Sequence, residues 1–134
     1  MKISKANKEN LREIITALEN GAVLVLPTDT VYGLVCDASN EKAVEKIFEI
    51  KKRDKTKPLA VFVKDIEMAK ELAVINDKQE EFLKDSKATV ILTAGHIDVG
   101  RLSKLVYKDE TIGIRIPNYE LLNLILVEFD KPLA

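Results

Sequence analysis

Apolar residues recur every three or four positions in several stretches of the chain. The first stretch begins after Asn7, a residue suited to cap a helix, and stops before Gly21. It predicts an amphipathic helix over residues 8–20. Its apolar residues are Leu11, Ile14, Ile15 and Leu18. Similar patterns predict further helices over residues 41–52, 66–73 and 77–85, and after Asn118.

Short runs that are almost wholly apolar lie between these helical stretches. Runs of this length with glycine or proline at their ends are typical of β-strands. The run AVLVLP, residues 22–27, is uniformly apolar, which predicts a strand buried on both faces. The other runs are LAVFV, ATVILT and TIGIRI, and the last residues, KPLA, resemble the beginning of another strand.

The order of these elements favours a particular fold class. Residues 22–63 read as strand, helix and strand in succession, which predicts an α/β arrangement of layers. If the two strands are parallel neighbours, the helix between them should form a right-handed crossover.

Size and charge limit the function classes. The 134 residues, 15.0 kDa, fit one domain over residues 1–134. The formal net charge is -1, so any affinity for phosphate must come from a local patch rather than from the chain as a whole. No apolar run is long enough for export or for crossing a bilayer, and we expect a cytoplasmic protein without a membrane partner.

Residues that bind metals or form disulfides are scarce. Cys36 is the only cysteine, which excludes an internal disulfide and argues against a cysteine-rich zinc site. The only histidine, His96, has no companion ligands nearby in the sequence and is predicted to be a solvent-facing loop residue. We therefore expect no metal site built by the protein itself.

A cluster of hydroxyl groups follows the first apolar strand, in PTDTVYGL. In an extended segment Thr28, Thr30 and Tyr32 would project to one side, and Gly33 would allow a ligand to approach the backbone closely. Ligands of open α/β sheets bind beyond the carboxyl ends of strands, where this segment lies. The alternative is a structural turn, in which the hydroxyl groups satisfy nearby backbone groups.

A second cluster, KKRDKTK at residues 51–57, concentrates positive charge. Its five cations against one acidic residue give a local charge of +4. Arg53 could hold a phosphate or carboxylate through two parallel hydrogen bonds, and Lys51 and Lys57 could add point charges. The alternative is a solvated basic loop that also favours the dipole at the end of the preceding helix.

Taken together, PTDTVYGL and KIFEIKKRDKTKPLAVFV resemble the YrdC-like family of threonylcarbamoyl-AMP synthases. In that family the first segment has the form Pro-Thr-x-Thr-x-Tyr-Gly-Leu, and the second has Lys-x-Arg followed by Lys-Pro-Leu. The segment GIRIPNYELLNLIL is similar to the family's strand-Arg-x-Pro-helix segment. The matching residues are Pro27, Thr28, Thr30, Tyr32, Gly33, Leu34, Lys51, Arg53, Lys57, Pro58, Leu59, Arg115 and Pro117.

The resemblance implies a fold, a reaction and a set of partners. The fold would be an α/β, YrdC-like twisted mixed parallel and antiparallel sheet with flanking helices around a basic concave cleft. The reaction would form threonylcarbamoyl-AMP and pyrophosphate from L-threonine, bicarbonate and ATP, with Mg²⁺. The product would serve the threonylcarbamoyladenosine modification of tRNA, so tRNA and other tRNA-modification proteins are expected partners. The implied substrate- and nucleotide-binding residues are Thr28, Thr30, Tyr32, Lys51, Arg53, Lys57, Thr89 and Arg115, and no catalytic residue is assigned.

Two departures from the family pattern keep other hypotheses open. The family's Pro-Gly-Pro-x-Thr turn keeps Thr89 here, but Asp85, Ser86 and Lys87 precede it. The final KPLA stands where the resemblance implies a following Ser/Thr-Ser-Ala-Asn motif and further strands. One alternative is a noncatalytic module that binds nucleotide, tRNA or double-stranded RNA. Another is an interaction protein that completes its open sheet with a second chain.

Overall fold

The computed structural model describes residues 7–27, 32–85, 88–95 and 102–134. The helices are α1 (Leu11–Glu19), α2 (Glu41–Lys51), α3 (Ile66–Leu72), α4 (Asp77–Asp85) and α5 (Glu120–Phe129), with 3₁₀ turns η1 (Lys8–Asn10) and η2 (Lys104–Val106). The strands are β1 (Leu24–Pro27), β2 (Tyr32–Val35), β3 (Val61–Phe62), β4 (Ala73–Val74), β5 (Val90–Ala94), β6 (Tyr107–Lys108) and β7 (Thr111–Arg115).

α2 and α3 begin where a polar side chain satisfies one of their first backbone N–H groups. Asn40 Oδ1 accepts a hydrogen bond from the Ala43 amide at 3.0 Å, and Asp65 Oδ1 accepts one from the Met68 amide at 2.8 Å. Of the four helices with a predicted range, α2, α3 and α4 match it within one residue at each end, whereas α1 begins three residues later than predicted because residues 8–10 form η1. None of the described helices combines the length and apolar character needed to cross a membrane.

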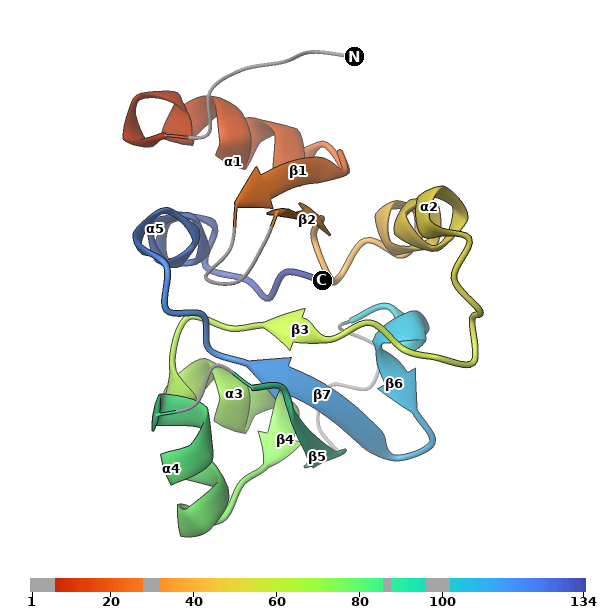
Figure 1. The fold of residues 1–134 in the computed structure, drawn as a ribbon, viewed down its shortest axis with the longest axis vertical. Coiled ribbons are helices and arrows are strands. Elements are labelled where there is room, and N and C mark those ends of the chain that lie inside the picture. Colours follow the sequence, from red (N-terminus) through yellow and green to blue (C-terminus); the bar gives the residue numbers. More distant parts are fainter. Residues whose placement is uncertain (1–6, 28–31, 86–87, 96–101) are drawn as a thin grey trace.

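Two sheets organise the strands. β1 and β2 form an antiparallel hairpin, and the second sheet has the order β3-β7-β5-β4, with β6 also paired to β7. β3 runs parallel to β7 whereas β5 runs antiparallel to it, so the predicted mixed sheet is confirmed. Figure 1 shows α1, the hairpin and α5 in one half of the molecule and the larger sheet in the other.

The condition for a right-handed crossover, that the first strand and β3 are parallel neighbours, is not met. β1 pairs with β2 and not with β3, because the chain turns back at once into a hairpin. The prediction that residues 22–27 are buried on both faces is wrong, since the Val25 side chain is 63% exposed whereas Leu26 is only 3% exposed. The hairpin packs one face against the apolar cluster that contains α1 and α5, and Val25 lies on the other face.

Residues 132–134, which we call the seam, join the two sheets. On one side, the amides of Cys36 and Ala134 each donate to the other's carbonyl oxygen, at 3.1 and 2.9 Å. On the other side, Phe62 and Leu133 make the same reciprocal pair, at 2.7 and 3.0 Å. The strand-like character predicted for KPLA is therefore confirmed as two isolated bridges of Leu133, and the seam continues the hydrogen bonding from β2 to β3.

Two apolar clusters form the core, and the seam contributes to both. The first packs α2 and α3 against the larger sheet and includes Ala134. The second packs α1 and α5 against the hairpin and includes Leu133, whose side chain is fully buried. The two halves of the molecule thus share the seam both in backbone pairing and in packing.

Cys36 is fully buried beside the seam, and its thiol should be unreactive. Burial, together with the neighbouring Asp37 carboxylate, raises the pKa of this thiol from 9.0 to about 12. The protonated thiol therefore contributes to stability below pH 9, and this contribution is lost as the pH rises toward 12.

We expect iodoacetamide at pH 8 to leave the folded protein unmodified and to alkylate one thiol in urea. Alkylation of the folded protein as fast as free cysteine would contradict this.

Candidate functional site

The larger sheet has one packed face and one open face. Along β5 and β7, Leu92, Ile112 and Ile114 are buried against the helices, as the alternation of side chains along a strand requires. On the opposite face the Ile91 side chain is 65% exposed and Val74 of β4 is 60% exposed. This open face is a surface on which a ligand could lie.

Arg115 at the end of β7, Phe62 at the end of β3 and Thr89, which directly precedes β5, lie on the side of the larger sheet opposite to its packed face. Val90 pairs with Ile114, so one step further along the antiparallel register Thr89 lies opposite Arg115. On the other side Arg115 pairs with Phe62, and its guanidinium carbon lies 5.9 Å from the centre of the Phe62 ring. This is within the range of a cation–π contact. Thr89 and Arg115 are thus the next residues after the last printed pair of β5 and β7, and the substrate binding that the resemblance assigns to them stays a prediction.

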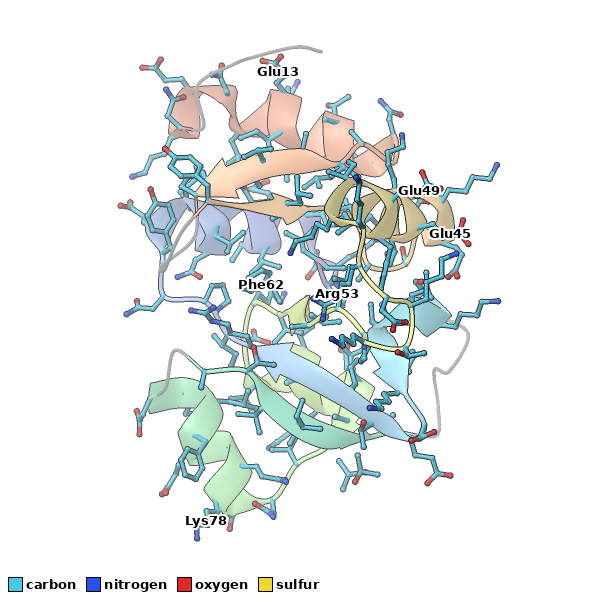
Figure 2. The ribbon with its side chains drawn as sticks, turned by 45° about the vertical axis from the view of Figure 1, so that its right-hand side comes forward. Glu13, Glu45, Glu49, Arg53, Phe62 and Lys78 are labelled. Carbon is cyan, nitrogen blue, oxygen red and sulfur yellow. The ribbon has the colours of Figure 1, made fainter. Side chains whose placement is uncertain are left out.

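Phe62 was not among the predicted site residues. The signal was present in LAVFV, because alternation places Phe62 on the face opposite to the buried residues Val61 and Val63. The aromatic ring gives the guanidinium of Arg115 a surface to lie on, and Figure 2 shows Phe62 between α5 and the larger sheet.

Gly113 keeps the open face low between Thr89 and Phe62. A Cβ atom at this position would lie 3.0 Å from Cγ2 of Thr89 and 3.3 Å from Cδ1 of Ile91. A side chain there would require the side chains of Thr89 and Ile91 to shift by a few tenths of an ångström. Glycine in a strand interior often marks such a close approach.

The stretch of residues 51–57, which we call the basic loop, leaves α2 through a left-handed residue. Lys52 has φ 52°, and the Arg53 amide reaches back to the Phe48 carbonyl at 2.9 Å. Next, the Asp54 carboxylate accepts the Thr56 amide at 2.9 Å, and hydrogen bonds from Thr56 hold the pKa of Asp54 below its ordinary value. The loop is thus ordered by its own hydrogen bonds.

The lysines of the basic loop point to solvent, but its arginine does not. The side chains of Lys51 and Lys57 are exposed, whereas Arg53 is half-buried. Arg53 Nε donates to the Lys57 carbonyl and Nη2 to the Pro58 carbonyl, each at 2.9 Å. Figure 2 shows Arg53 near the chain that leads into β3.

The hydroxyl cluster is described only in part. Thr28 and Thr30 lie outside the described residues, as does His96. Tyr32 is the first residue of β2, paired with Pro27, and its side chain is 72% exposed. Within the described ranges, no hydrogen bond or ion pair links Tyr32 to the basic loop, so the predicted meeting of these two motifs stays a prediction.

Comparison with known proteins decides the family. The protein-family model for Sua5, YciO and YrdC proteins, described as "Telomere recombination", matches residues 16–134. The chain belongs to this family. The Sua5/YciO/YrdC resemblance and the mixed α/β fold expected from the sequence are both confirmed.

Curated relatives of this family are about 30–34% identical to this chain over the aligned residues. Threonylcarbamoyl-AMP synthase of Vibrio vulnificus is 30% identical over 133 residues, which are 93% of this chain and 69% of that protein. A relative from Methanocaldococcus jannaschii is 34% identical over 125 residues, which are 88% of this chain. The chain spans only 58% of the length of that relative.

Solved structures with the same fold include two with bound ligands. P. abyssi Sua5 complexed with L-threonine has a TM-score of 0.79 and 26% identity, and the match covers 99% of this chain and 39% of that one. Full-length HypF in its phosphate- and nucleotide-bound form has a TM-score of 0.83 and 25% identity, covering 92% of this chain and 19% of that one.

Proposed function

We propose that this chain carries the threonylcarbamoyl-AMP synthase activity for which its curated relatives are named. One observation supports the proposal: Val90 pairs with Ile114, which leaves Thr89 and Arg115 as the next residues along the two segments, in a fold that matches that of threonine-bound Sua5. The nucleotide-bound HypF structure supports a nucleotide as the second substrate. The proposed substrates are therefore L-threonine, bicarbonate and ATP.

The proposed reaction has two steps that involve crowded anions. The threonine nitrogen attacks the carbon of bicarbonate, and loss of water leaves a carbamate. A carbamate oxygen then attacks the α-phosphorus of ATP, the bond to the bridging oxygen breaks, and pyrophosphate leaves. Positioning of the two substrates and neutralisation of their charge are the main demands on the protein. No nucleophilic side chain is required.

The described residues suit these demands. The guanidinium of Arg115 can bind a carboxylate or phosphate through two parallel hydrogen bonds, and the Thr89 hydroxyl can donate beside it. The exposed Lys51 and Lys57 can neutralise phosphate oxygens. As part of the same proposal, Thr28, Thr30 and Tyr32 help to shape the threonine and nucleotide pocket.

Mg²⁺ enters this proposal as part of the substrate. The described residues contain no group of three histidine, cysteine or acidic side chains that could hold a metal ion. Mg²⁺ is commonly bound through substrate phosphates and water rather than by a cage of protein ligands. We therefore propose that it arrives with ATP and neutralises phosphate charge.

A protein that uses ATP for tRNA modification fits a cytoplasmic location, which is part of the same proposal. In this proposal tRNA and tRNA-modification proteins are the later partners of the product.

Pyrophosphate release tests the proposal directly. We expect the folded protein, supplied with Mg²⁺ and ATP, to release pyrophosphate only when both threonine and bicarbonate are present. Carbon-13 bicarbonate should label the nucleotide product, which mass spectrometry would detect. A folded protein whose pyrophosphate release does not depend on threonine would contradict the proposed function.

A further inference from the structure

The guanidinium of Arg53 is engaged with the backbone of its own loop. Nε and Nη2 donate to two consecutive carbonyl oxygens, those of Lys57 and Pro58, both at 2.9 Å. The planar guanidinium presents its donors in a fixed fork, so it can hold two neighbouring carbonyls at once. A lysine ammonium has no such fork.

This contact closes the basic loop at its far end. At the near end, the loop is fastened to α2 by the left-handed Lys52 and by the Arg53 amide, which bonds to Phe48. In the middle, the Lys57 amide donates to the Asp54 carbonyl at 3.0 Å. Arg53 is therefore the residue that connects the beginning of the loop to the chain entering β3.

The lysines of the loop lack comparable restraints. Lys51 and Lys57 are exposed, and none of the ion pairs in the described part of the chain includes them. Their long side chains lose rotamer freedom when they hold a phosphate. A backbone that is already fixed removes part of this ordering cost, because only the side chains must still be ordered on binding.

We propose that Arg53 is a positioning residue, which holds the basic loop in the conformation that presents Lys57 to the phosphates of ATP. This inference rests on the proposed function for the identity of the ligand. It gives Arg53 a role besides the direct anion contact expected from the sequence, because two of its five N–H donors already hold the backbone of the loop.

The conservative variant Arg53→Lys separates the two roles. It keeps the positive charge but cannot bridge the carbonyls of Lys57 and Pro58. We expect Arg53→Lys to weaken ATP binding about tenfold, nearly as much as Arg53→Ala, by calorimetry. Lys57→Ala should also weaken ATP binding, whereas Lys78→Ala on α4 should not.

Hydrogen exchange supplies a second measurement that needs no ligand. In Arg53→Lys and Arg53→Ala, the amides of Thr56 and Lys57 should exchange faster than in the wild type. In Lys57→Ala and Lys78→Ala, exchange in the loop should stay unchanged, because the carbonyls and Arg53 remain. The amides of β5 and β7 serve as a control for the fold in every variant.

Two outcomes would overturn the proposal. One is an Arg53→Lys protein that binds ATP like the wild type, and the other is unchanged exchange of the loop amides in both Arg53 variants. If the wild type itself binds no ATP, the proposed function is contradicted, and the exchange experiment still decides whether Arg53 orders the loop.

Discussion

Replacing Arg115 by alanine is expected to lower kcat/KM for threonine-dependent pyrophosphate release about 100-fold, the size of effect seen when one donor to a developing anion is removed. Arg115 lies on the open face, opposite Thr89 and over the Phe62 ring, where its charge can meet a carboxylate or phosphate. Initial rates at varied threonine and ATP concentrations would measure the change and show which substrate it affects.

Two further variants make this measurement specific. Arg115→Lys should retain an intermediate rate, because it keeps the charge but loses the planar contact with Phe62. Lys78→Ala removes a cation from α4, at the end of the molecule away from Phe62 and Arg53 in Figure 2, and should react like the wild type. A folded Arg115→Ala protein with a rate within twofold of the wild type would remove Arg115 from the site.

Leu133→Ala is expected to lower the free energy of unfolding by about 3 kcal/mol, as for other fully buried leucines that are cut back to alanine. The Leu133 side chain is fully buried in the cluster that holds α1 and α5 against the hairpin. Its backbone bonds to Phe62 remain in the variant, so the loss should come from packing. Urea denaturation followed by circular dichroism would measure it.

Val127→Ala provides the matched control for this packing loss. Val127 lies on α5, close in sequence to the seam, but its side chain is 57% exposed. Its truncation should change the free energy of unfolding by no more than about 0.5 kcal/mol. A Leu133→Ala protein that loses less than about 1 kcal/mol would show that the seam contributes little to the packing of the two halves.

The helices could be predicted well because their signals are local. The spacing of apolar residues and the capping residue Asn40 predicted residues 41–52, and α2 spans Glu41–Lys51. The end of this helix differs by one residue because Lys52 adopts the left-handed conformation, which an ordinary side chain takes only at a modest cost and which no simple pattern reveals.

The strand pairings could not be predicted, because they join segments far apart in the sequence. β2 was missed as a strand because Gly33 and the preceding hydroxyl residues are typical of a turn. β2 folds back on β1, and the seam lies between the end of β2 and β3, so β3 joins the hydrogen bonding through the seam rather than through β1. The apolar run of β1 alone could not indicate that Val25 faces outward.

The site residues stay predictions, and the structure gives positions for some of them. Thr89 and Arg115 were chosen from separate motifs, and the antiparallel register of β5 and β7 places them opposite each other. The sequence suggests an anion contact for Arg53 from its residue type, and residue type cannot reveal that two of its five N–H donors hold backbone carbonyls. Thr28 and Thr30 remain predictions that the described residues do not reach.

The position of the seam also has a consequence for the order of folding. Leu133 pairs with Asp37 and with Phe62, so the junction between the sheets consists of contacts of high sequence separation. Such contacts form slowly, since the entropy of closing a long loop must be overcome first. During synthesis, the hairpin and β3 leave the ribosome well before the residues that join them. We therefore expect the two halves of the nascent chain to stay undocked until the seam emerges. During that interval the chain should depend on chaperones.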